Sequence, residues 1–187
     1  MNAAEHFFCS STVWRYITQH HLLPWVLSGA ELGDHLLEIG AGYGAATAQL
    51  KARVTRVTSL EYDHKSARRL KLQHNAQLGG PVCGDAAQLP FASQTFSSAL
   101  AILVLHHLKS PTLQDQMFAE VFRVLRPGGM FIAFEVTDSW IHRVVHLRST
   151  FTPVAPSSVT PRLTAAGFST IVLNHCSGAF RVTAQRM

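Results

Sequence analysis

Apolar runs alternate with amphipathic stretches along most of this chain. Strand-like runs occur at 35–39, 56–61, 81–84, 98–104 and 130–136. Helix-compatible stretches lie between most of them, and this alternation predicts a parallel sheet with helices on both faces. The segment 99–105 is apolar without a polar face, so we expect it to form a central strand that is covered on both sides.

Amphipathic spacing also places the helices. In residues 10–21 a serine stands at a plausible N-cap and apolar side chains recur at helical spacing, and we expect Pro24 to end this first helix. A second helix is predicted over 112–129, where the sequence RPGG stops it. The segment 137–156 has no clear pattern.

The C-terminal part departs from the simple alternation. After a helix that Gly167 should stop, a strand is expected from Phe168, and a last strand over 179–186. Only a short CSG segment separates these two strands, so they should form an antiparallel hairpin instead of another crossover unit.

Composition excludes several classes of protein. Hydrophobic residues make up 47% of the 187 residues and charged residues 14%, which excludes a disordered chain. No apolar stretch reaches the ~20 residues of a membrane-spanning helix. No secretory signal is evident at the N-terminus, so we expect a cytoplasmic location. Cys9, Cys83 and Cys176 form no C-x-x-C pair, which favours free thiols and predicts no metal site.

The net charge of +5 raises the question of nucleic-acid binding. Lys65, Arg68 and Arg69 lie at helical spacing on what should be an exposed face, and the other basic residues are scattered without interleaved aromatic residues. This distribution is typical of a solvated surface, so a nucleic-acid partner is not expected.

The segment HLLEIGAGYGAATAQL (35–50) contains the main candidate for ligand binding. An apolar strand, closely spaced glycines and a helix-favouring stretch form a turn whose backbone N–H groups can face a ligand. Gly40, Gly42 and Ala45 satisfy the dinucleotide pattern G-x-G-x-x-G/A, and Glu61 follows about 20 residues later, as in nicotinamide enzymes. A nicotinamide-dependent oxidoreductase is therefore one interpretation.

Three other features favour S-adenosylmethionine. Glu38 lies two residues before Gly40, where it would repel a diphosphate and attract a sulfonium and an ammonium group. Asp85 follows the third strand and could accept a hydrogen bond from an adenine amino group. The closing antiparallel hairpin is not expected of a fold made of two mononucleotide-binding halves.

Four motifs occur in series: LLEIGAGYG, VTSLEYD, GDAAQLPFASQTFSSALAILVLHHL and VLRPGGMFIAFE. In order and spacing they resemble the class I S-adenosylmethionine-dependent methyltransferases, in the type 11 group that includes quinone-biosynthesis methyltransferases. The resemblance covers about residues 33–137 by motif and the remainder by topology. It implies an α/β, Rossmann-like fold with helices on both faces of a seven-stranded sheet in the order 3-2-1-4-5-7-6, mostly parallel with an antiparallel last strand.

The resemblance also implies a cofactor, S-adenosylmethionine, which leaves as S-adenosylhomocysteine. Glu61 would bind the ribose hydroxyls, Tyr62 would line the adenine, and Ala101 would offer its backbone to the ammonium group. The residues assigned to the cofactor lie at or near the ends of the first four strands: Glu38, Gly40, Ala41, Gly42, Gly44, Glu61, Tyr62, Asp85, Ala86 and Ala101.

The implied reaction is in-line methyl transfer to a small-molecule acceptor, with oxygen or carbon favoured over nitrogen because the N/D-P-P-Y signature is absent. Alignment of the acceptor supplies most of the catalysis, and a base is optional. If a base acts, the candidates are His106, His107 and His142, each of which could instead be structural.

The acceptor site would be shaped by two segments of one domain that covers 1–187: an N-terminal helical lid (1–30) and a variable substrate segment (137–156). Trp14, Tyr16, Trp140 and His142 are the candidate substrate contacts, with ordinary packing or a surface loop as the alternative. The chain could be a monomer or a homodimer. A non-catalytic or RNA-associated protein that binds S-adenosylmethionine also remains an alternative.

Overall fold

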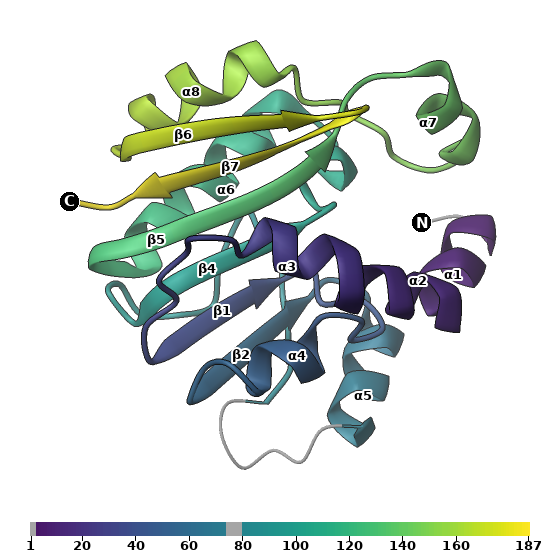
Figure 1. Ribbon diagram of the computed structural model, residues 1–187, viewed down its shortest axis with the longest axis horizontal. Coiled ribbons are helices and arrows are strands. Elements are labelled where there is room, and N and C mark those ends of the chain that lie inside the picture. The colour runs from purple at the N-terminus through teal and green to yellow at the C-terminus, as the bar shows by residue number, and fades with distance from the viewer. Residues whose placement is uncertain (1–2, 74–79) are drawn as a thin grey trace.

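The computed structural model describes residues 3–73 and 80–187, and its centre is a seven-stranded sheet in the order β3-β2-β1-β4-β5-β7-β6 (Figure 1). β7 runs antiparallel to its neighbours β5 and β6, and the other pairs are parallel. The predicted sheet order and closing hairpin are therefore confirmed. The strands are β1 (His35–Ile39), β2 (Arg56–Glu61), β3 (Val82–Cys83), β4 (Phe96–Ile102), β5 (Leu125–Val136), β6 (Ser169–Cys176) and β7 (Ala179–Gln185).

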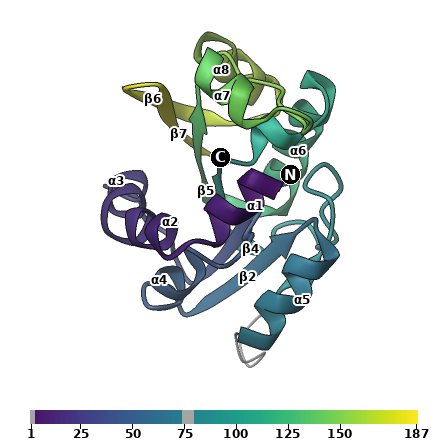
Figure 2. The ribbon, with the colours of Figure 1, turned by 90° about the vertical axis from the view of Figure 1, so that its right-hand side faces the viewer.

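Helices cover both faces of the sheet (Figure 2). One apolar cluster joins the sheet to α3 and α4, and the other joins it to α6 and α8. The helices are α1 (Ala3–Ser10), α2 (Thr12–Ile17), the π-helical η1 (Thr18–Leu22), α3 (Leu23–Val26), α4 (Thr47–Lys51), α5 (His64–Gln73), the 3-10 helix η3 (Leu105–His107), α6 (Pro111–Val124), α7 (Trp140–Val145) and α8 (Pro156–Ala165).

The expectation that Pro24 ends the first helix was wrong, because helical structure continues to Val26. In the π-helical segment the Leu23 amide donates to the Thr18 carbonyl, five residues earlier. Pro24 then stands in the first turn of α3. Proline has no N–H to donate, and the π turn just before it interrupts the i→i−4 hydrogen-bond pattern that a proline would otherwise break.

The strand β5 begins five residues earlier than predicted. α6 ends at Val124, as the RPGG sequence indicated, but Leu125 already pairs with Phe96 of β4. The backbone of Gly128 and Gly129 bonds to Arg186, beyond the end of β7, and this keeps the turn in line with the sheet. β4 is correspondingly shifted, from the expected 98–104 to 96–102.

The parallel strands end at one edge of the sheet, and α1 and α7 lie across this carboxyl edge (Figure 2). α1 is tied to the glycine-rich loop by a 2.9 Å hydrogen bond between His6 Nδ1 and the Tyr43 hydroxyl. The three cysteines are free thiols, as expected. In the described parts of the chain, no helix has the length and apolar character needed to span a bilayer.

Candidate active site

The glycine-rich loop leaves the carboxyl end of β1 in a conformation that requires glycine. Gly40, Gly42 and Gly44 have φ angles of +70°, +54° and +76°. A Cβ on Gly40 would stand 2.5 Å from Val104 Cγ2, so a side chain there would collide with the segment after β4. The amides of Gly40 and Ala41 both donate to the Leu60 carbonyl, which fixes the loop against the end of β2.

Glu61 stands at the end of β2 and faces this loop. One carboxylate oxygen accepts the Gly42 amide at 2.7 Å and the other accepts the Asp63 amide at 2.9 Å. Each oxygen keeps capacity for another donor, so the carboxylate could also receive ribose hydroxyls. Tyr62 follows with 72% of its surface exposed, a position from which its ring is accessible to a ligand.

Glu38 lies inside the sheet rather than at its solvent edge. It is buried in β1, and its Oε2 accepts hydrogen bonds from Thr47 Oγ1 at 2.8 Å and Ser59 Oγ at 2.7 Å. Burial raises the pKa of this carboxyl group, and the two hydroxyl donors oppose that shift. Glu38 therefore connects β1, β2 and α4 beneath the loop.

The other assigned cofactor residues lie along the same edge. Asp85 follows β3, is exposed, and accepts the Ala87 amide at 2.8 Å. Ala86 beside it is buried. Ala101 is fully buried in β4, in register with Ile39 of β1 and Ala133 of β5. The structure thus brings the ends of β1 and β2 into direct contact through Glu61 and Gly42, with β4 beside β1.

The candidate bases His106 and His107 form η3, just after β4. His106 is buried, and its Nδ1 lies 2.6 Å from Glu135 Oε2, while Glu135 Oε1 accepts the Leu105 amide at 2.7 Å. Burial, together with the neighbouring His106 and His146, lowers the pKa of His107 to about 3. His107 is therefore neutral near pH 7 and a weak proton acceptor.

The candidate substrate residues lie mostly at the surface. Trp140 is 74% exposed on α7, and Tyr16 is 59% exposed with its ring against His20 and His21. Trp14 is half-buried and packs against Phe8. Trp14 and Tyr16 therefore contact other residues of the N-terminal helices, whereas Trp140 belongs to α7.

His142, the remaining candidate, is fixed locally. Its Nδ1 lies 2.9 Å from Ser139 Oγ and 2.8 Å from the Thr137 carbonyl oxygen, at the start of α7. Because these partners lie within five residues of it, His142 orders the turn into α7.

Three residues of this edge were missed by the sequence analysis: Glu135, Glu5 and His146. Glu135 could have been found, because a carboxylate near the end of the apolar strand 130–136 demands a buried partner. Glu5 and His146 carry no such local signal, and only the fold brings them together, with His146 Nε2 3.7 Å from Glu5 Oε1.

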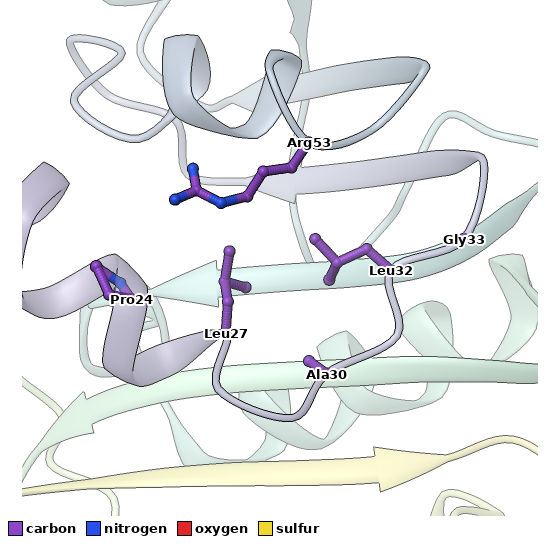
Figure 3. Close-up of a pocket in the computed structure, with 6 residues that line it drawn as sticks. All are labelled: Pro24, Leu27, Ala30, Leu32, Gly33 and Arg53. Atoms are coloured by element: carbon purple, nitrogen blue, oxygen red, sulfur yellow. The ribbon is translucent and has the colours of Figure 1, made fainter.

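A separate cavity of about 370 Å³ lies at the opposite edge of the sheet (Figure 3). Its lining comes from α3, the segment before β1 and the segment before β2, so it opens at the amino ends of the strands: Pro24, Leu27, Ala30, Leu32, Gly33 and Arg53. Among the described residues that line it, Arg53 alone has an ionisable side chain. The chemical groups assigned above all lie at the carboxyl edge.

Comparisons with known proteins agree with this geometry. A family model described as "Methyltransferase domain", of type 11, matches residues 37–133. The 24-methylenesterol C-methyltransferase 2 of Oryza sativa subsp. japonica is 34% identical over 123 residues, which is 61% of this chain and 32% of that protein. This chain belongs to the class I S-adenosylmethionine-dependent methyltransferase family, in its type 11 group.

Solved structures share the fold over nearly the whole chain. The PH0226 protein from Pyrococcus horikoshii OT3 has a TM-score of 0.81 at 16% identity and covers 98% of this chain and 97% of its own. The N-methyltransferase NodS from Bradyrhizobium japonicum WM9, in complex with S-adenosylhomocysteine, has a TM-score of 0.74 at 19% identity, with 99% and 93% covered. The match to the plant sterol enzyme, by contrast, spans about a third of that protein's length.

Proposed function

We propose that this chain binds S-adenosylmethionine at the carboxyl edge of β1 and β2 and transfers its methyl group to a small-molecule acceptor. The observation that carries the proposal is the hydrogen bond from the Gly42 amide to the Glu61 carboxylate. It places an acid for ribose hydroxyls directly beside Gly42, where a Cβ would meet no described atom within 4 Å.

We assign the cofactor contacts by position along this edge. Glu61 takes the ribose, Tyr62 lies along the adenine, and Asp85 with Ala86 lies at the adenine edge. The loop 40–44 and the backbone of Ala101 take the methionine part. Glu38 supports the loop from below, through Thr47 on α4, and adds negative charge near the cationic sulfonium and ammonium groups.

The reaction is a displacement at the methyl carbon. The methyl–sulfur bond breaks with its electron pair passing to sulfur, and a new bond to the acceptor forms on the opposite side. S-adenosylhomocysteine leaves with an uncharged sulfur, and the methylated acceptor releases one proton to solvent. Aligning the two reactants can supply several kcal/mol of the barrier reduction, about 7–11 kcal/mol in the best cases. Carbon is the acceptor atom that we favour over oxygen, because the curated relative is named as a C-methyltransferase.

The structure gives a reason to assign no general base. A base works best with a pKa near the working pH, and the pKa of His107 is about 3. His142 is engaged at the start of α7, and His106 is buried with its Nδ1 against Glu135. The acceptor itself is expected to be apolar, because α7 presents several exposed apolar side chains beside the site, among them Trp140, Ile141 and Val144.

The test is calorimetric binding of S-adenosylhomocysteine to the Glu61→Ala variant. Removing the carboxylate deletes charge-assisted hydrogen bonds of about 1.5–3 kcal/mol each, so affinity should fall by at least about tenfold. Glu31→Ala is the matched control, because Glu31 is an exposed acid before β1. This variant should bind S-adenosylhomocysteine with unchanged affinity. Equal affinities for both variants and the unchanged chain would overturn the ribose assignment.

Methyl transfer is tested separately. The full chain is incubated with S-adenosylmethionine and an apolar metabolite extract, and release of S-adenosylhomocysteine is measured. Acceptor-dependent release that is reduced in Glu61→Ala supports the proposed activity. Normal cofactor binding without release from any apolar or polar extract would support the non-catalytic alternative.

A further inference from the structure

Three histidines converge at the carboxyl edge, outside the contacts assigned to the cofactor. His106 and His107 belong to η3, and His146 follows the last turn of α7. Each of them offers one ring nitrogen, and these nitrogen atoms all lie within 4.8 Å of one another. The His106 and His107 ring centroids are 4.2 Å apart, and those of His106 and His146 are 5.0 Å apart. The cluster is largely buried.

Two of the three rings, those of His106 and His146, have their Nδ1 atom engaged outside the cluster. His106 Nδ1 lies 2.6 Å from Glu135 Oε2, and His146 Nδ1 lies 2.7 Å from the His142 carbonyl oxygen. Both acceptors require a proton on Nδ1, which leaves the Nε2 lone pair unprotonated in the neutral ring. An imidazole whose outer N–H is bound to a carboxylate or carbonyl is the usual state of a metal-ligating histidine.

The charges around the cluster suit a dication. Neutral rings supply lone pairs but no charge. Two buried carboxylates flank the group: Glu135 beside His106, and Glu5, whose Oε1 is 3.7 Å from His146 Nε2. Two negative charges next to three neutral ligands would balance one divalent ion.

We infer that His106, His107 and His146 bind one divalent transition-metal ion of the zinc class. Imidazole ligands suit Zn²⁺, Co²⁺, Ni²⁺ and Cu²⁺, whereas Mg²⁺ and Ca²⁺ take oxygen ligands. Small rotations of the rings would bring the nitrogens to metal bonds of about 2.0–2.1 Å. Three protein ligands leave a fourth position for water or another oxygen ligand.

The site would join separate parts of the fold. η3 follows β4, His146 follows α7, and Glu5 belongs to α1, where its carboxylate also accepts a hydrogen bond from Ser149. Binding an ion would therefore fasten α7, and through Glu5 the N-terminal helix, to the edge of the sheet. This inference does not depend on methyl transfer, and its readouts are independent of activity.

The experiment uses the full chain without a histidine tag, stripped with a chelator and titrated with Co²⁺ and then Zn²⁺. We expect one Co²⁺ per chain with the visible absorption bands of tetrahedral coordination, and displacement of these bands by one equivalent of Zn²⁺. His146→Ala and, separately, His107→Gln should abolish these bands, with folding checked by circular dichroism. Glu135→Gln should weaken binding by about 10- to 100-fold through loss of the outer hydrogen bond.

The matched control is His175→Ala, which removes an exposed histidine on β6 and should leave the Co²⁺ bands unchanged. Three results would overturn the inference: no tetrahedral Co²⁺ spectrum, equal binding by the unchanged chain and a folded His146→Ala variant, or a thiolate-to-metal charge-transfer band, which would place the ion on a cysteine.

Discussion

Two glutamates on neighbouring strands show how position decides the role of a side chain. Glu61 ends β2, and both of its oxygens accept backbone amides at the edge of the sheet. Glu38 is enclosed in β1, where two hydroxyl groups share one of its oxygens. Glu61 is placed to meet a ligand. Glu38 is desolvated by burial, which disfavours its charged form, and its hydrogen bonds hold the loop in position.

The burial of the Glu38 carboxyl group leads to a pH-dependent prediction for the Glu38→Gln variant. Burial raises the pKa of Glu38 above its reference value of 4.5, so its carboxyl group is a weaker acid in the folded chain than in the unfolded one. The contribution of the protonated Glu38 to the free energy of unfolding is complete below pH 4.5. It is lost as the pH rises through the folded-state pKa of this group. Glutamine has no charge to bury, so the variant should gain stability over the unchanged chain by about 1.4 kcal/mol per pH unit in that window.

The measurement is urea unfolding from pH 4 to pH 8. We expect the difference in unfolding free energy between Glu38→Gln and the unchanged chain to widen with pH and then level off. Glu31→Gln, which removes an exposed acid, should show no such trend. A difference for Glu38→Gln that stays constant across this range would contradict the assignment of a raised pKa.

At the scale of elements, α6 is held at both ends by polar contacts. Ser110 caps its N-terminus by accepting the Leu113 amide at 3.2 Å. At the other end, Arg186 Nη1 from beyond β7 lies 2.6–2.9 Å from the carbonyl oxygens of Phe122, Arg123 and Leu125. A cation at this end satisfies carbonyls that have no partner within the helix.

Arg186→Ala should therefore destabilise the protein by about 1.5–3 kcal/mol, the range for hydrogen bonds to a charged group. Arg126→Ala is the matched control, because its ion pair with Asp34 is exposed and should contribute only about 0–1 kcal/mol. Urea unfolding at neutral pH measures the free energy of unfolding of both variants. Similar losses for the two variants would contradict the cap at the end of α6.

The elements also show what the sequence could predict. Buried strands such as β1 and β4 contain short apolar runs, so their existence followed from the pattern and their order from the motifs. The continuation of helix through Pro24 could not be foreseen, because it depends on a π turn that only the packing of Leu23 and Val26 against the sheet selects. The early start of β5 depends in the same way on pairing between Leu125 and Phe96.

At the scale of the whole molecule, contacts between distant segments limit how much of the site the sequence can predict. Glu61 and the glycine loop were assigned from sequence because they end adjacent strands, whose carboxyl ends must meet. The contact of Ser149 with Glu5 joins residues 144 positions apart, and no periodic pattern encodes it. The histidine cluster was missed because His146 is 39 or more positions from the other two histidines. The sequence argument about metals also considered only cysteine spacing.

At the same scale, ligand-dependent stability distinguishes the two classes of cofactor. A ligand that binds only the folded state at about 100 times its Kd adds about 2.7 kcal/mol, which for a chain of this size raises Tm by roughly 5–10 °C. We expect S-adenosylhomocysteine to give such a shift. NADH should shift Tm by less than about 1 °C, because weak binding adds little stability and Glu38 beneath the glycine-rich loop disfavours a diphosphate there. The net charge of +5 attracts both NADH and simple diphosphates in the same non-specific way, so pyrophosphate at equal concentration serves as the control for that attraction. A larger shift with NADH than with S-adenosylhomocysteine would contradict the proposed electrostatics of the edge.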